Sequence, residues 1–395
     1  MTTLQNLMAD AQAMHETLIE TRRALHRIPE PGFAEIKTQA LIMKRLDALG
    51  IPYSTERTWV IAEIQGALPG GRVALRADMD ALPIQEPQGC PFRSTHDGYM
   101  HACGHDAHTA IQLGAAQLLA QRRNELRGSI RLLFQPAEET EGGALPMAQA
   151  GAMDGVDAVY GLHVQPYMLV GDIDSRPGCL NASTDEVRIR IRGVSGHAAR
   201  PEQCVDAIVC AAQMITALQT VVSRGTSPLD SAVLSLGTIH GGEARNVICD
   251  SVEIGGTLRT VDPRLRERLH ERIRSVCAGI AAACQAQCDC AILPGYAPLM
   301  NDEGEFERVL RLGRRLLGAE HVHRRTSPSM GGEDFSYFAE RAPGAFWHLG
   351  CSAKLPAPTL HSKDLVVDER CLPIGVALEC ALALDRLNCL ENEEV

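Results

Sequence analysis

Residues 100–110 read MHACGHDAHTA and constrain this chain more than any other stretch. They place three histidines, one cysteine and one aspartate directly ahead of a strongly apolar helical pattern, where a chain that only fills a core would use aliphatic residues. The helix is expected from about Thr109, which leaves His105 and Asp106 at its N-terminal end, where free backbone amides favour negative charge. Cys103 and His105 are two residues apart and would leave the same face of an extended segment, and thiolate with imidazole suits zinc. We therefore predict a metal-binding corner. A buried thiol beside a capping histidine is the alternative.

The composition indicates a globular protein that does not bind nucleic acid or an anionic membrane. Its 395 residues carry a net charge of -11 and a pI near 5.7, whereas such partners require basic patches. No apolar run approaches the roughly 20 residues of a membrane-spanning helix. The fourteen cysteines are scattered through helical and strand patterns, and no secretory signal opens the sequence, so we expect a reducing, cytoplasmic location. The group Cys284, Cys288 and Cys290 is interpreted as structural.

Three apolar strands are each followed by acidic or imidazole side chains. In an open α/β sheet, the ligand crevice lies beyond the carboxyl ends of the strands, so such side chains are expected to meet. The strands expected at 72–77, 128–134 and 158–162 lead to Asp78 and Asp80, to Glu138 and Glu139, and to His163. The sequence therefore predicts a site assembled from distant parts of one sheet.

Residues 185–294 have a different pattern and are expected to form a domain of their own. Residues 186–192 alternate between apolar and charged side chains, as a half-exposed strand does. A helix at 201–223, strands at 232–239 and 247–260, a helix at 262–285 and a strand at 289–293 complete the order β-α-β-β-α-β. We predict a mixed-sheet α/β catalytic domain from 1–184 and 295–395, with 185–294 inserted as a ferredoxin-like α+β lid and dimerisation domain. Helices are also expected at 5–28, 303–317 and 372–390.

Mixed donors across the first domain are sufficient for two divalent ions. The candidate ligands are Cys103, His105, Glu139, His163 and His361. Zinc, manganese, cobalt or nickel could occupy this set of sulfur, nitrogen and oxygen donors. Glu138 and Glu139 would point to opposite sides of an extended segment, one to a metal and one to a metal-activated water whose pKa falls to about 7. This arrangement is typical of a hydrolase, although a paired Glu-Glu can also be a solvated turn.

Seven motifs occur in order over nearly the whole chain: RADMDALPI, MHACGHDAHTA, FQPAEE, GLHV, SGHAARP, GGEDFSYF and LHSKDLVVDE. Together they resemble the hippurate hydrolase and indole-acetyl-amino-acid amidohydrolase branch of the aminoacylase and carboxypeptidase di-metal peptidases. The resemblance implies the same five metal ligands and makes Glu138 the general base. Asp80 is similar to the family's acidic residue that supports a metal ligand without binding the metal itself. Asp78 is left outside the ligand set.

The resemblance also suggests roles for four residues beyond the metal ligands. His197 would reach an active site across a dimer contact and polarise the scissile carbonyl, whereas its plain interpretation is a loop histidine. Asn246 and Arg259 match positions that hold the substrate's carboxylate or carbonyl, a task suited to the bidentate guanidinium. Arg259 could equally be an exposed strand residue. Gly332 lies in a turn expected to line the substrate crevice.

The leading hypothesis is a di-metal amidohydrolase that cleaves the amide of a small N-acyl-amino acid and works as a homodimer or homotetramer. Within the same chemistry, the alternative is deacetylation of N-acetyl-diaminopimelate or another N-acetylated metabolite. Two other classes remain open: an enzyme with Cys103 as nucleophile and His105 as its base, and a non-catalytic metal-dependent binding protein.

Overall fold

The computed structural model describes residues 3–389, which fall into two compact units. The first unit comprises Met1–Leu180, Met300–Ser327 and Asp334–Val395, and the second comprises Asn181–Leu299 and Pro328–Glu333. No helix within residues 3–389 has both the length and the apolar character that crossing a bilayer requires.

The first unit is built on an eight-stranded mixed sheet with the order β1-β2-β4-β3-β5-β16-β6-β15. β3, β4, β5 and β16 form a parallel centre. β1 pairs antiparallel with β2, β2 with β4 and β6 with β16, whereas the edge strand β15 pairs parallel with β6. The predicted mixed α/β class is confirmed. The strands are β1 Tyr53–Glu56, β2 Trp59–Gln65, β3 Leu68–Asp78, β4 Arg127–Gln135, β5 Ala158–Leu169, β6 Ile173–Ser175, β15 Val322–Arg324 and β16 Gly344–Ser352.

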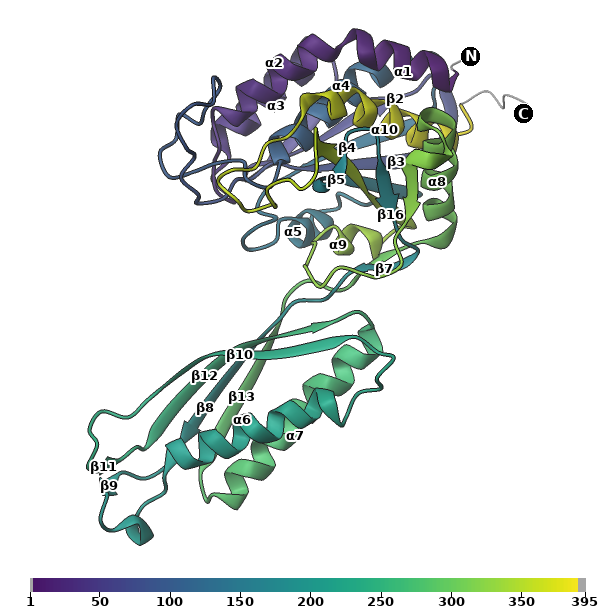
Figure 1. Cartoon of the computed structure of the whole chain (residues 1–395). Coiled ribbons are helices and arrows are strands. Elements are labelled where there is room, and N and C mark those ends of the chain that lie inside the picture. The colour runs from purple at the N-terminus through teal and green to yellow at the C-terminus, as the bar shows by residue number, and fades with distance from the viewer. Residues whose placement is uncertain (1–2, 390–395) are drawn as a thin grey trace. The chain divides into compact units, whose positions relative to one another are not determined.

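Helices cover both faces of this sheet. Figure 1 shows α1, α2, α4 and α10 on one side of it and α5 and α9 on the other. The helices are α1 Leu4–Ala13, α2 His15–His26, α3 Ile36–Ala48, α4 His105–Gln121, α5 Ala144–Gln149, α8 Glu303–Leu317, α9 Ser336–Ala339 and α10 Leu372–Arg386. Every residue of α4 from His105 to Ala116 is buried, as expected of a helix that is apolar all round. His105, a candidate metal ligand and the first residue of α4, is therefore held within the core.

Three predicted helices of the first unit differ from the structure. The expected helix at 5–28 is two helices, because Met14 leaves helical geometry at φ -90° and ψ 0°. α4 begins at His105 rather than at Thr109, since the left-handed Gly104 turns the chain there. The closing helix was expected to reach residue 390, but it ends at Arg386, and Leu390 lies outside the described residues.

The second unit has a four-stranded antiparallel sheet with the order β10-β12-β8-β13. α6 and α7 pack on one face of this sheet (Figure 1). The elements are β8 Asp185–Arg192, β9 Gly196–His197, α6 Ala207–Ser223, β10 Ala232–Gly241, β11 Val247–Ile248, β12 Ser251–Thr260, α7 Pro263–Ala283 and β13 Gln287–Pro294. The short strands β7 Gly178–Asn181 and β14 Leu299–Asn301 lie where the chain leaves and re-enters the first unit.

Local capping explains where the second unit departs from prediction. The helix expected at 201–223 is a 3-10 turn, Pro201–Gln203, followed by α6, because Asp206 accepts hydrogen bonds from Ile208 and Val209 and starts a new helix. The strand expected at 247–260 is divided into β11 and β12. In β8 the alternation is as predicted, with its apolar side chains buried and its arginines exposed.

Candidate metal centre

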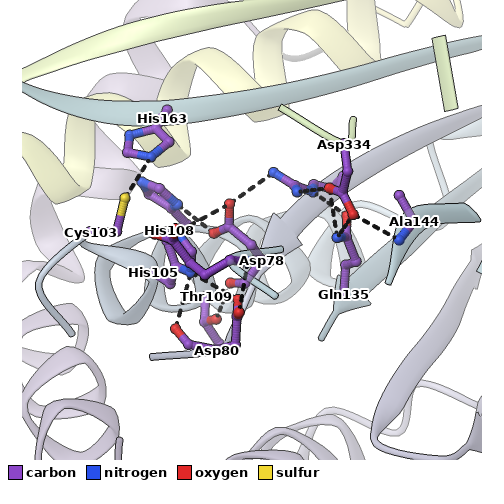
Figure 2. Close-up of polar contacts among 12 residues, drawn as sticks. Asp78, Asp80, Cys103, His105, His108, Thr109, Gln135, Ala144, His163 and Asp334 are labelled. Atoms are coloured by element: carbon purple, nitrogen blue, oxygen red, sulfur yellow. Dashed lines mark hydrogen bonds and ion pairs between the residues drawn. The ribbon is translucent and has the colours of Figure 1, made fainter. Parts of the chain in front are cut away.

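Five side chains from separate parts of the first unit converge beyond the carboxyl ends of its central strands. Donor atoms of Cys103, His105 and His163 lie within 4.8 Å of one another, and so do those of Cys103, Glu139 and His361. Figure 2 shows Cys103, His105 and His163 facing one another. The structure thus brings together all five residues that the sequence singled out as ligands.

The Cys103–His105 corner is a turn, not the extended segment predicted. Gly104 lies between them at φ +86°, a left-handed conformation that glycine adopts without strain. The backbone N–H of His361 donates to the carbonyl of Ala102 at 2.8 Å and ties the His361 loop to the same corner. His361 itself has φ +60°, and its side chain is 52% exposed.

His105 is oriented by Asp80 and presents one ring nitrogen without a partner. Its Nδ1–H donates to Asp80 Oδ1 at 3.1 Å, and this bond fixes the orientation of the ring and hence of Nε2. Nε2 is buried and has no hydrogen-bond partner among the described residues; it lies 3.7 Å from Asp78 Oδ2 and 3.9 Å from Glu139 Oε1. Burial lowers the pKa of His105, but the carboxylates of Asp78, Asp80 and Glu139 outweigh it and raise the pKa to about 10. The surroundings of Nε2 therefore favour a cation.

Cys103 and His163 form the sulfur and nitrogen side of the site. Cys103 Sγ lies 3.2 Å from His163 Nε2, and the Nδ1–H of His163 donates to the carbonyl of Val164 at 2.7 Å. Burial, together with the charges of Glu139 and Glu138, raises the pKa of the Cys103 thiol well above its usual value. A thiolate here consequently requires a compensating positive charge, which a divalent ion supplies.

Glu138 and Glu139 follow β4 in a turn, so the prediction that they alternate in an extended segment is wrong. Ala137 enters this turn at φ +57°, and its N–H donates to the buried carboxylate of Glu35 at 2.9 Å. Glu139 Oε1 lies 3.0 Å from His361 Nε2, and the Glu139 N–H donates to Asp80 Oδ2 at 2.9 Å. Burial raises the pKa of Glu139, but hydrogen bonding to His361 and the charge of His105 lower it below its usual value. Glu138 is buried, and its carboxylate belongs to a donor group with His105 and Glu139.

Asp78 and His108 have other partners. The Nδ1–H of His108 donates to Asp78 Oδ1 at 2.5 Å, and His108 Nε2 accepts the Val164 N–H at 2.9 Å. Because both ring nitrogens are engaged, His108 positions its neighbours and does not present a free donor. Asp78 Oδ2 accepts from Arg76 at 2.8 Å, a contact that restrains it behind the site.

Sequence reasoning missed the buried ion-pair network that supports Asp78. Arg76, fully buried, also donates to Asp334 Oδ1 at 3.0 Å and to Gln135 Oε1 at 2.7 Å. An arginine between two apolar positions of a central strand was the available signal, since such a charge is buried only when it is paired.

The four remaining candidates, His197, Asn246, Arg259 and Gly332, lie in the second unit. His197 is exposed on β9, where the N–H of its neighbour Ala198 donates to the Asn246 carbonyl at 3.1 Å. A Cβ added to Gly332 would lie 3.5 Å from Arg259 Nη1. Within the second unit, His197 therefore lies near Asn246, and Gly332 lies near Arg259. The roles of these four residues remain predictions.

Residues 74–385 match the sequence model described as peptidase family M20/M25/M40. The chain belongs to this family. It is 41% identical to the N-acetylcysteine deacetylase of Bacillus subtilis (strain 168), over 95% of this chain and 98% of that protein. It is 38% identical to IAA-amino acid hydrolase ILR1-like 5 of Arabidopsis thaliana, over 95% of this chain and 88% of that protein.

Two solved structures match nearly the whole chain. A putative aminohydrolase from methicillin-resistant Staphylococcus aureus superposes with a TM-score of 0.93 at 33% identity, over 97% of this chain and 99% of that one. The YXEP protein of Bacillus subtilis is described as a dinuclear metal-binding peptidase from the M20 family. Its structure superposes with a TM-score of 0.84 at 37% identity, over 95% of this chain and 99% of that one. The predictions of an enzyme and of the wider peptidase family are therefore confirmed: this M20 protein is a hydrolase. The predicted metal cofactor agrees with the donor groups described above, and the identity of the metal remains a prediction.

Proposed function

We propose that this M20 enzyme hydrolyses the amide bond of N-acyl-amino acids with two divalent ions per subunit, releasing a carboxylic acid and a free amino acid. The observation that carries the proposal is the convergence of five mixed donors with a further carboxylate, Glu138, beside them. The unpartnered Nε2 of His105 and the neutral Cys103 thiol among carboxylates both fit a cation-binding role.

The chain's own groups account for proton transfer. Cys103, His105, Glu139, His163 and His361 would hold the ions. Divalent ions bound there supply Lewis acidity that polarises the scissile carbonyl and lowers the pKa of water toward neutrality. Glu138 takes a proton from the attacking water as the oxygen adds to the carbonyl carbon. It then returns that proton to the amide nitrogen as the carbon–nitrogen bond breaks.

Substrate recognition is assigned to the second unit. Arg259 would bind the substrate carboxylate, Asn246 its carbonyl or carboxylate, and Gly332 would line the acyl pocket, where a side chain would take up space. His197 would stabilise the oxyanion in the active site of a partner subunit of a homodimer or homotetramer. The second unit would act as an inserted lid and dimerisation domain. Sedimentation that finds only monomer at full activity would remove this role of His197.

The acyl group is the finer part of the proposal. One relative is named for an N-acetyl substrate and another for an indole-acetyl conjugate, and both names describe N-acyl-amino acids. We propose a hippurate-like aromatic or aliphatic acyl group, with N-acetyl-diaminopimelate or another N-acetylated metabolite as the alternative. Comparing kcat/KM for benzoyl-, acetyl- and indole-acetyl-amino acids distinguishes them, because pocket volume determines acyl preference.

All fourteen cysteines are free, which supports the proposal of a reducing, cytoplasmic location. The buried, protonated Cys103 gives little support to a thiol nucleophile, because the thiolate is the reactive form.

Replacing Glu138 tests the mechanism. Glu138→Gln keeps the shape of the side chain but removes its base, so kcat is expected to fall by about 10²–10⁴-fold at unchanged metal content. Glu141→Gln, an exposed acid in the same loop, is the matched control and should retain wild-type kcat. Near-normal kcat in Glu138→Gln, or turnover that survives complete chelation, would refute the mechanism. If the wild type turns over no N-acyl-amino acid, the proposed substrate class is wrong.

A further inference from the structure

A second group of mixed donors lies in the first unit, outside the five expected ligands. It consists of His26, the last residue of α2, and of Glu86 and Cys90 in the loop that follows β3. Their nitrogen, oxygen and sulfur donor atoms all lie within 4.8 Å of one another. We propose that His26, Glu86 and Cys90 form an additional site for a borderline-soft divalent ion such as zinc.

The ring of His26 is held in the orientation that a metal ligand requires. Its Nδ1–H donates to Asp106 Oδ2 at 2.7 Å, and Arg22 Nε donates to the same oxygen at 2.7 Å. Asp106 is buried, and Arg22 and His26 share one of its carboxylate oxygens. A carboxylate on one ring nitrogen leaves the other nitrogen, Nε2, to bind the ion.

Glu86 supplies the oxygen donor, and one of its two carboxylate oxygens faces His26. Glu86 Oε2 accepts the Ser94 N–H at 2.6 Å, and Glu86 Oε1 lies 3.1 Å from His26 Nε2. A proton shared between Nε2 and Oε1 occupies the place that the ion would take. Binding of one divalent ion then displaces the His26 Nε2 proton and the Cys90 thiol proton, so two protons leave as two positive charges enter.

The cluster opens to solvent and has a further donor nearby. His26, Glu86 and Cys90 all line a cavity of about 510 Å³, and Cys90 is half-buried at its wall, which leaves an entry path and room for water as another ligand. His101 is 2% exposed, neither of its ring nitrogens has a hydrogen-bond partner among the described residues, and its ring lies 6.2 Å from that of His26.

The other charged groups of the lining are largely paired with one another. Besides Glu86, the lining includes Asp364, Asp368 and Glu369, of which Asp368 pairs with Arg370 and Glu369 with Arg22 and Arg23. The cations of the lining are Arg22 and Lys363, so the types of donor atom, rather than the charge of the cavity, indicate which ion would bind. A mixed sulfur, nitrogen and oxygen set selects zinc, cobalt or cadmium over calcium or magnesium, which prefer oxygen alone.

Metal counting on the full-length enzyme tests the site. After dialysis against excess Zn²⁺ and washing in metal-free buffer, Cys90→Ser is expected to retain one ion fewer per subunit than the wild type and to keep wild-type kcat. Cys204→Ser, a half-buried thiol in the second unit, is the matched control and should lose no ion. Loaded with Co²⁺, Cys90→Ser should also show a weaker thiolate-to-cobalt absorption band than the control.

Alkylation of the unmutated protein gives an independent measurement. Zn²⁺ should slow the reaction of Cys90 with iodoacetamide at least tenfold, as read by peptide mass spectrometry, and leave Cys204 unaffected. Equal metal content in the wild type and Cys90→Ser, or alkylation of Cys90 at the same rate with and without Zn²⁺, overturns the proposal. Because these readouts compare Cys90 with Cys204, they hold whether or not the proposed amidase activity is found.

Discussion

Asp80 supports two expected ligands at once, so its replacement by asparagine should weaken metal binding. One of its carboxylate oxygens accepts from His105 Nδ1–H at 3.1 Å, and the other accepts from the Glu139 N–H at 2.9 Å. Asp80 is 1% exposed, so solvent cannot replace either bond. His105 Nδ1 also lies 3.0 Å from the main-chain oxygen of Asp80, and the variant keeps this contact. An asparagine side chain at this position would have one acceptor oxygen, and its NH₂ group would have to face one of the two donors.

The size of the effect follows from that mismatch. A buried donor left without a partner costs about 1–3 kcal/mol. Since about 1.4 kcal/mol corresponds to a factor of ten, Asp80→Asn should weaken metal binding about 10–100-fold, the range found when groups that orient metal-binding histidines are lost. His105 would also lose the carboxylate that makes its Nε2 more basic. At saturating metal, kcat should fall much less than metal affinity.

Titrating activity and bound metal in buffered Zn²⁺, Co²⁺ or Mn²⁺ measures this effect. Asp97→Asn is the matched control, because the Asp97 side chain is 96% exposed and makes only a long contact with Arg93. Circular dichroism should show that both variants are folded. Wild-type metal affinity in Asp80→Asn, or an equal loss in Asp97→Asn, would refute the reasoning from the two hydrogen bonds.

Two further predictions concern stability. Arg76→Met should lower the free energy of unfolding by about 3–5 kcal/mol in urea titrations, because it leaves the buried carboxylates of Asp78 and Asp334 without their cation; a loss below about 1 kcal/mol would contradict this. Burial raises the pKa of Glu35 from 4.5 to about 7, so the folded protein binds this proton more tightly than the unfolded chain, and about 3 kcal/mol of stability should be lost as the pH rises from 4.5 to 7. Glu35→Gln should flatten that slope, since Gln can still pair with Thr58; equal slopes in variant and wild type would show that Glu35 is not its source.

The sequence predicted the central strands and the convergence of the ligands because both follow local patterns. Apolar runs that end in Asp80, Glu139 or His163 can be recognised from a few neighbouring residues, and the parallel sheet then brings their ends together. The alternation of β8 was similarly informative, since a strand exposed on one face has a period of two. His361 follows no such strand or helix pattern; it was included as a further imidazole donor, and the motif resemblance implied the same role.

What the sequence missed depends on contacts between distant residues. The break at Met14 follows no glycine or proline, and the turn at Ala137 places a non-glycine residue at φ +57° where Glu35, about a hundred residues away, accepts its N–H. The pairing of Arg76 with Asp334 spans 258 positions. Such contacts become evident only when the sheet is assembled, because no local propensity encodes them.

The uneven burial of the five expected ligands bears on how quickly the ions exchange. Cys103, His105 and His163 are buried, with His105 anchored at the start of the central helix α4, whereas the His361 side chain is 52% exposed on a loop. Release through the buried side would require opening of the core, but a small displacement of the His361 loop detaches a single ligand. An ion bound through His361 should therefore exchange with solution faster than an ion bound only by the buried side chains.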